Sequence, residues 1–228
     1  MSLRDFGPNE LWFLLMAARW TVLLALIAFV GGGTIGLIVA ALRIAPLRPL
    51  RWLAVVYTQF FMGTPILIQL FMIYYGSSFL GFRPDPWFAA ALTFSLNGGA
   101  FFGEIFRGSI EAVPKGQWEA STALGFRFLG TLRLVIMPQA VQLMLPPTVG
   151  FMVQIVKTTS VASLIGFTKL ARAATQVNTV TFQPVLVFGT VSLVYFLLCW
   201  PLSLYAGHLE RKLGQVHIQT RKPLLMAS

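Results

Sequence analysis

Residues 20–42 have the sequence WTVLLALIAFVGGGTIGLIVAAL, an uninterrupted run without charge that is bounded by Arg19 and Arg43. An α-helix rises about 1.5 Å per residue, so about 20 apolar residues are enough to cross the hydrocarbon core of a bilayer. The run therefore predicts a transmembrane helix.

Four further stretches have the length and apolar character of membrane spans. They cover residues 52–80, 87–106, 139–166 and 185–207. The second is interrupted by Gly63-Thr64-Pro65 and the fourth contains Pro146-Pro147. Because proline removes a backbone hydrogen bond, we expect helix breaks at Gly63, Pro65, Pro146 and Pro147. Such breaks often mark binding sites in transporters, and a packing kink is the alternative.

The overall composition agrees with a membrane protein. Hydrophobic residues make up 57% of the 228 residues and charged residues only 11%, against about 25% charged residues in soluble domains. The mean hydropathy is +0.76. A soluble globule could not bury this much apolar surface, which excludes an ordinary cytosolic enzyme or a disordered chain. The predicted fold class is all-α, a polytopic membrane protein with five transmembrane helices.

The net charge of +10 comes from cations that flank the apolar runs, which argues against a nucleic-acid-binding protein. Cytoplasmic loops of membrane proteins carry an excess of Lys and Arg. One set of connections holds eleven cations, namely Arg43, Arg48, Arg51, Arg107, Lys115, Arg127, Arg133, Arg211, Lys212, Arg221 and Lys222. The opposite set holds Arg4, Arg19, Arg83, Lys169 and Arg172. We therefore expect the N-terminus outside and the C-terminus in the cytoplasm.

One domain is predicted. Residues 1–19 form an extracytoplasmic or interfacial lead-in, residues 20–207 form the transmembrane domain, and residues 208–228 form a cytoplasmic tail. Within the domain, residues 107–138 are too charged to lie in lipid. This segment is the only cytoplasmic piece large enough to fold by itself.

The charged segment has the signals of two short helices. Pro114 suits a helix start and Gly125 suits the left-handed position that follows a helix. A second helix is expected from Phe128 to about Ile136, and the next span is expected to begin at Pro138. Such a rigid element suits the docking of another protein, and a solvated loop on the headgroups is the alternative.

No catalytic residue or metal ligand is expected. The chain has no G-x-x-x-x-G-K-[ST] phosphate loop, so it cannot bind ATP by that route. Both histidines, His208 and His217, lie at or beyond the last span, which argues against an intramembrane hydrolase or zinc site. We predict that the protein is not an enzyme.

Five polar side chains within the spans are candidates for a substrate pathway. Polar side chains are costly in lipid unless they face protein or a water-filled cavity. The candidates are Gln69, Asn97, Glu104, Gln154 and Thr158. Two of them have structural alternatives, because Asn97 could bond to a neighbouring span and Glu104 could pair with Arg107 one turn along the helix.

Several motifs together resemble the permease subunits of bacterial ABC importers. The pattern Glu119-Ala120-Ser121-x-x-x-Gly125, followed after nine residues by Val135-x-Met137-Pro138, is similar to the EAA signature of that family. Ser121, Val135 and Met137 are mild departures from it. Residues 63–70, 103–117 and 157–166 are similar to the polar-amino-acid subfamily, which includes histidine and glutamine permeases. The resemblance covers residues 20–212.

The resemblance implies a type I ABC importer in a bacterial inner membrane. Such a machine has two permease subunits (identical or related), two ATPase subunits that hold ATP and Mg, and an extracytoplasmic solute-binding protein that delivers the amino acid. No cofactor is implied in this chain. The residues implied to couple the permease to its ATPase are Glu119, Ala120, Ser121, Gly125 and Pro138. A channel, a secondary carrier and a permease for another cargo are the alternatives.

The sequence departs from the family where charge would matter. Members often carry Glu at the position of Gln59, Arg at that of Met62, and Asp or Asn at that of Thr158. A pathway with few acidic groups is a poor host for a cationic amino acid. We therefore predict a neutral or acidic substrate.

Overall fold

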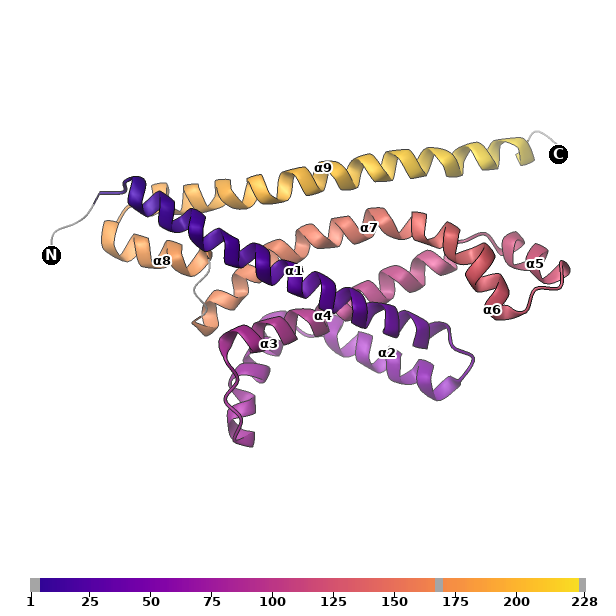
Figure 1. Cartoon of the computed structure of the whole chain (residues 1–228), viewed down its shortest axis with the longest axis horizontal. Helices are drawn as coiled ribbons and strands as arrows, with labels where there is room; N and C mark the ends of the chain where they lie inside the picture. The colour runs from indigo at the N-terminus through magenta and orange to yellow at the C-terminus, as the bar shows by residue number, and fades with distance from the viewer. Residues whose placement is uncertain (1–4, 167–169, 226–228) are drawn as a thin grey trace.

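The computed structural model describes residues 5–166 and 170–225, and all regular elements in these two ranges are helical. The longer helices form an elongated bundle (Figure 1) and are α1 (Pro8–Ile44), α2 (Arg48–Gly63), α3 (Ile66–Tyr74), α4 (Pro86–Glu111), α7 (Met137–Thr158), α8 (Leu170–Thr181) and α9 (Pro184–Leu225). The shorter elements are η1 (Gly76–Leu80), α5 (Lys115–Ala123), α6 (Phe128–Gly130), the π-helical η2 (Thr131–Ile136) and the 3₁₀-helical η3 (Thr159–Ile165). The predicted all-α class is confirmed.

Fewer helices than the expected five have the length and hydropathy of a membrane span. In the described part of the chain, three helices do, namely α1, the helix Phe128–Ile165 and residues Pro184–Leu213. The pair α2 and α3 qualifies as a fourth span only when taken together, with a bend of 102°. The remaining expected span, α4, lies between α1, α2, α3 and α7. Four of its polar residues, Thr93, Ser95, Asn97 and Ser109, are buried in the bundle, which lowers the mean hydropathy of α4 without exposing these side chains to lipid.

The first helix starts earlier than the sequence predicted. α1 begins at Pro8, so most of the expected lead-in is continuous with the first span. Leu14, Ala17 and Ala18 in this part are buried against α8 and α9. Packing on these neighbours explains why an apolar stretch too short to span a membrane alone is helical here. Likewise, α9 continues through residue 208, where the tail was expected to begin.

Glycines bring the backbones of α1 and α4 into contact. A Cβ atom at Gly32 would lie 3.1 Å from the Cα of Gly98, and one at Gly36 would lie 2.5 Å from the Cβ of Phe102. No larger residue fits at either position without a shift of the helices. The close approach fixes α4 in the centre of the bundle, and with it the side chains that α4 presents to α2, α3 and α7.

The helix after the charged segment is continuous, which differs from two expectations. A separate helix ending near Ile136 was predicted, but α6, η2, α7 and η3 join into one helix from Phe128 to Ile165. An interruption was also predicted at Pro146 and Pro147, yet α7 runs through both. Each proline removes only its own N–H donor, and the rest of the hydrogen-bond ladder holds the helix together.

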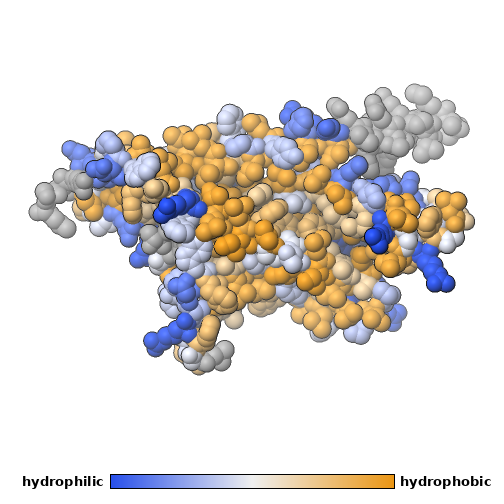
Figure 2. All heavy atoms as spheres, viewed as in Figure 1, coloured by the Kyte–Doolittle hydropathy of each residue, from blue (hydrophilic) through white to orange (hydrophobic). Residues whose placement is uncertain are grey.

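The polar residues gather at the two ends of the bundle. The start of α1 and α8 lie at one end, while α5, α6 and the C-terminal part of α9 lie at the other (Figure 1). Figure 2 shows apolar surface across the middle and hydrophilic residues toward both ends. This distribution is that of a chain which crosses an apolar layer. Arg4 and Lys169, which the charge argument placed outside, are not among the described residues.

Candidate functional site

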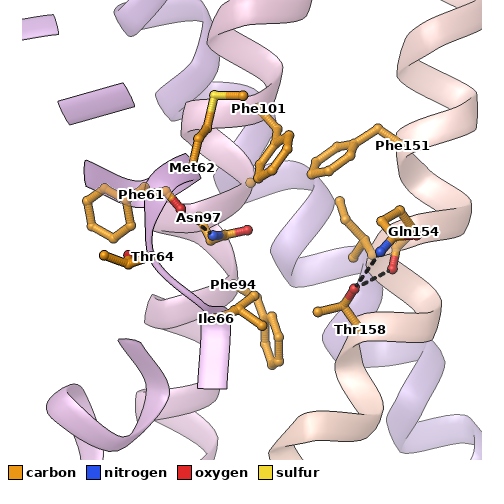
Figure 3. A pocket seen from close by; sticks show the side chains of 12 residues that line it. Phe61, Met62, Thr64, Ile66, Phe94, Asn97, Phe101, Phe151, Gln154 and Thr158 are labelled. Atoms are coloured by element: carbon orange, nitrogen blue, oxygen red, sulfur yellow. Dashed lines mark hydrogen bonds between the residues drawn. The ribbon is translucent and has the colours of Figure 1, made fainter. Parts of the chain in front are cut away.

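A cavity of about 380 Å³ lies beside the break between α2 and α3. Helices α2, α3, α4 and α7 form its walls, and its lining residues are Phe61, Met62, Thr64, Ile66, Phe94, Asn97, Gly98, Phe101, Phe151, Gln154, Ile155 and Thr158 (Figure 3). Among the described residues, those that line the cavity include four with polar side chains and none with a formal charge. The size and the mixture of apolar walls with a few polar groups are typical of a small-molecule site.

Three of the five predicted pathway residues line this cavity. Asn97 projects from α4, and Gln154 and Thr158 project from α7 on the facing wall (Figure 3). The side-chain oxygen of Thr158 donates to the backbone oxygen of Gln154 at 2.8 Å, and Nε2 of Gln154 is 3.4 Å from that same hydroxyl. Gln69 is buried behind the cavity and Glu104 lies elsewhere on α4, so the structure does not bring these two to the cavity wall.

The expected break at Gly63 and Pro65 is present, and two side-chain amides hold it in place. The carbonyl of Phe61 would accept from the N–H of residue 65 in a continuous helix, but Pro65 has none. Nε2 of Gln69 donates to this carbonyl at 2.9 Å, and Nδ2 of Asn97 donates to it at 3.0 Å. The amides thus replace a backbone donor that the proline removes.

The two amides also bond to each other and to Thr64. Nδ2 of Asn97 donates to Oε1 of Gln69 at 3.1 Å, and Nε2 of Gln69 donates to the carbonyl and hydroxyl oxygens of Thr64 at 3.0 and 2.8 Å. Gln69 therefore has a structural role. Asn97 has two roles, because its Nδ2 group supports the break while its side-chain oxygen turns toward the cavity on the side of Gln154 (Figure 3).

Glu104 belongs to a network of charges at the end of α4. Its carboxylate accepts from Nε and Nη2 of Arg107 at 2.9 and 2.6 Å, which is the pairing expected from their spacing. It also pairs with Nη2 of Arg43 on α1 at 2.9 Å, and Arg107 reaches Glu111 as well. The contact between Arg43 and Glu104 was not predicted, because it depends on how α1 packs against α4.

The charged segment contains the predicted helix and glycine turn. α5 follows Pro114 and ends before Gly125, which has a φ of +82°. The N–H of Phe126 donates to the carbonyl of Ser121 at 3.1 Å, and that of Gly125 donates to Thr122 at 3.0 Å. This pair of bonds is the Schellman arrangement, which requires a left-handed residue and favours glycine.

The predicted coupling residues lie in different surroundings. Glu119 and Ala120 are exposed on α5, while Pro138 is exposed in the first turn of α7. Ser121 is buried; its hydroxyl donates to the carbonyl of Trp118 at 2.8 Å and lies 3.1 Å from the hydroxyl of Thr131. Ser121 therefore joins α5 to the helix that follows, and Glu119 and Ala120 form the outward face.

The sequence did not identify the apolar residues of the cavity or the exposed apolar residue of the charged segment. Four phenylalanines line the cavity, and the rings of Phe101 and Phe151 stack at 4.9 Å. Leu124, next to the glycine turn, is 77% exposed. A phenylalanine in an apolar span can face lipid, the protein core or a cavity. The sequence carries no signal that distinguishes these three environments. The exposed leucine could have been noticed as an apolar residue in a polar segment.

Comparison with known proteins places the chain among transport permeases. The L-cystine transport system permease protein TcyB of Bacillus subtilis (strain 168) is 37% identical over 213 residues, which are 92% of this chain and 91% of that protein. The arginine transport system permease protein ArtQ of the same strain is 32% identical over 215 residues, 92% of this chain and 97% of ArtQ.

A solved structure agrees with these relatives. A chain from the crystal structure of an amino acid ABC transporter with histidines has a TM-score of 0.84 and 29% identity, and the match covers 88% of this chain and 94% of that one. Residues 32–215 match the family described as binding-protein-dependent transport system inner membrane component. The helical bundle, the broken span and the folded charged segment agree with this match, and the chain belongs to that family of ABC transporter permeases.

Proposed function

We propose that this permease carries neutral polar amino acids and that the substrate passes through the cavity between α2, α3, α4 and α7. The observation that carries this proposal is the lining of the cavity, which combines amide and hydroxyl groups with aromatic rings and has no charge among the described residues. A cationic or an anionic side chain would lose its hydration there without an opposite charge to replace it. The relatives transport cystine and arginine by name, so the family alone does not select the substrate.

The two charged groups of a zwitterionic amino acid fit the start of α3 and the side chain of Asn97 on α4. The N–H of Ile68 donates to the carbonyl of Pro65 at 3.0 Å, and the two N–H groups before it, at the start of α3, favour a carboxylate. Ile66, the first residue of α3, lines the cavity. The side-chain oxygen of Asn97 faces the same space and would accept from the ammonium group. Gln154 and Thr158 on the opposite wall are then placed to contact the side chain of the substrate.

The test is direct binding to the permease. A binding protein has a specificity of its own, so labelled amino acids should be measured against the purified permease–ATPase complex without it. We expect glutamine to compete for the site and arginine and glutamate to compete at least about tenfold less well. Stronger competition by arginine than by glutamine would contradict the proposal.

As a member of a binding-protein-dependent transport family, the chain works with an ATPase and a binding protein. We infer that α5 is its docking helix for the ATPase, which holds the ATP and Mg, and that two permease subunits form the membrane part. The exposed side chains of Glu119, Ala120 and Leu124 support this inference, because the first two lie on α5, Leu124 directly follows it, and a glycine turn and Ser121 hold this helix in place. Affinity purification from the native membrane should recover the ATPase and show whether the second permease is a copy or a relative.

We infer five membrane crossings, with α4 as the central one, the N-terminus outside and the C-terminus in the cytoplasm. The support is that the ends of α1 and α4, which carry Arg43 and Arg107, lie at the same end of the bundle as the C-terminal part of α9 and as the coupling segment formed by α5 and α6 (Figure 1). Single cysteines at Thr179 and at Lys212, in a chain in which Cys199 is replaced by alanine, would test this. Only the cysteine at position 179 should react with an impermeant maleimide added outside, and the reverse result would invert the topology.

A further inference from the structure

A second cavity lies where the coupling segment meets the membrane helices. It has a volume of about 400 Å³ and is formed by α1, α2, α4, α5 and α6. Its polar wall contains Arg43, Arg51, Arg107 and Glu111, and the rings of Trp118 and Phe128 close one side. These rings stack at 6.2 Å between centroids. The cavity is separate from the one at the helix break and uses none of its residues.

The charges around this second cavity do not cancel. Arg107 is bonded to both Glu104 and Glu111, and Arg43 pairs with Glu104 through Nη2 at 2.9 Å. Arg51 donates from Nη2 to the carbonyl of Ala45 at 3.0 Å, which is a neutral acceptor. Three arginines therefore face two carboxylates, and one positive charge remains. A guanidinium has five N–H donors, so Arg43 and Arg51 have donors beyond those bonds.

We propose that this cavity binds one phosphate group, presented either by an anionic phospholipid headgroup or by free phosphate. One phosphodiester carries one negative charge and would neutralise the surplus. Arginine forms paired hydrogen bonds to phosphate oxygens, and basic pockets at the cytoplasmic ends of membrane helices are typical headgroup sites.

The surface beside the cavity accommodates the rest of a lipid. On α2, next to Arg51, the side chains of Trp52 and Leu53 are 67% and 63% exposed. Exposed apolar residues there offer a surface for acyl chains, and tryptophan is enriched at the level of the headgroups. The bound phosphate would contact α1, α2 and α4 of the membrane part, while Trp118 and Phe128 belong to the coupling segment. The bound phosphate would thus lie between the membrane helices and the coupling segment, in a cavity separate from the proposed substrate cavity.

The experiment compares two arginines of the same helix. Arg51→Gln removes a residue that lines the cavity, and Arg48→Gln removes an exposed arginine three residues away that does not. The intact permease–ATPase complex of each variant is titrated with phosphatidylglycerol in mild detergent, and bound lipid is counted by native mass spectrometry. We expect Arg51→Gln to weaken the retention of phosphatidylglycerol about fivefold or more and Arg48→Gln to leave it unchanged. Arg51→Lys should restore part of the retention, because it keeps the charge.

Two further arms identify the source of the phosphate and test the charge argument. Phosphatidylcholine, which has the same phosphate but no net charge, should be retained less than phosphatidylglycerol. If excess inorganic phosphate displaces phosphatidylglycerol, the site recognises the free anion as well; if it does not, the lipid is the ligand. Equal retention of the two lipids by the wild type, or an equal effect of the Arg48 and Arg51 substitutions, would overturn the proposal.

Discussion

Nδ2 of Asn97 on α4 donates to Oε1 of Gln69 on α3 at 3.1 Å, and both amides also donate to the carbonyl of Phe61 on α2. Three helices therefore meet at one backbone oxygen. The oxygen needs these donors because residue 65 is proline. The wall of the cavity and the break in the helix are one structural unit, so a change in either amide should alter both.

Gln69→Leu should destabilise the protein. The substitution keeps the approximate size of the side chain but leaves the partly buried carbonyls of Phe61 and Thr64 with fewer donors. The loss of donors to buried acceptors costs about 1–3 kcal/mol, and we expect a lower midpoint of thermal unfolding and reduced uptake. Gln142→Leu on the exposed face of α7 is the matched control. Equal unfolding midpoints for the two variants would show that the amides do not support the break.

The sequence predicted those features that depend on residues close to one another along the chain. The apolar runs, the break at Pro65 and the glycine turn at Gly125 are of this kind, because a local rule of hydrogen bonding or backbone conformation determines each. The pair of Arg43 and Glu104 and the rings that line the cavity were not predictable in this way. They depend on which faces of the helices meet, and many apolar faces are equivalent in sequence.

The prolines of α7 show where a local rule is insufficient. Pro65 interrupts the helix, while Pro146 and Pro147 do not, although the sequence offers the same reason for all three. The difference lies in the surroundings. At Pro65 the side chains of Gln69 and Asn97 satisfy the carbonyls that a sharp bend exposes, and this compensation comes from other positions in the chain.

Gly125→Val should impair the coupling of ATP hydrolysis to transport. The φ of +82° at this position opposes any side chain with a Cβ atom, and a left-handed residue costs roughly 1–2 kcal/mol without glycine. We expect the complex to insert into the membrane normally but to show less substrate-stimulated uptake per ATP hydrolysed. Gly125→Asn should be milder, since asparagine tolerates this conformation better. Gly189→Val on α9, which has open space around it and lies outside the coupling segment, is the control, and a loss of coupling as large as that of Gly125→Val would argue against the turn.

Glu119→Lys should weaken the association with the ATPase. Glu119 is exposed on α5, so the substitution leaves the packing of this chain intact and reverses one charge on the proposed docking face. We expect the affinity for the ATPase to fall about five- to tenfold, measured by co-purification at increasing salt. Glu210→Lys reverses an exposed charge on α9 and should have no effect. Unchanged recovery of the ATPase with the Glu119 variant would remove this residue from the interface.

Thr158→Asp should shift the preference of the cavity toward cationic amino acids. Thr158 lies on the wall opposite Asn97, and the cavity has no acidic side chain among the described residues that line it. A hydrogen bond to a charged partner contributes about 1.5–3 kcal/mol, so binding of arginine relative to glutamine should rise about tenfold. The measurement is competition for the purified permease–ATPase complex without the binding protein. Thr175→Asp on the exposed surface of α8 adds the same charge outside the cavity and should leave the ratio unchanged. If both variants shift the ratio equally, the charge acts at a distance and the cavity is not the place where the side chain of the substrate is selected.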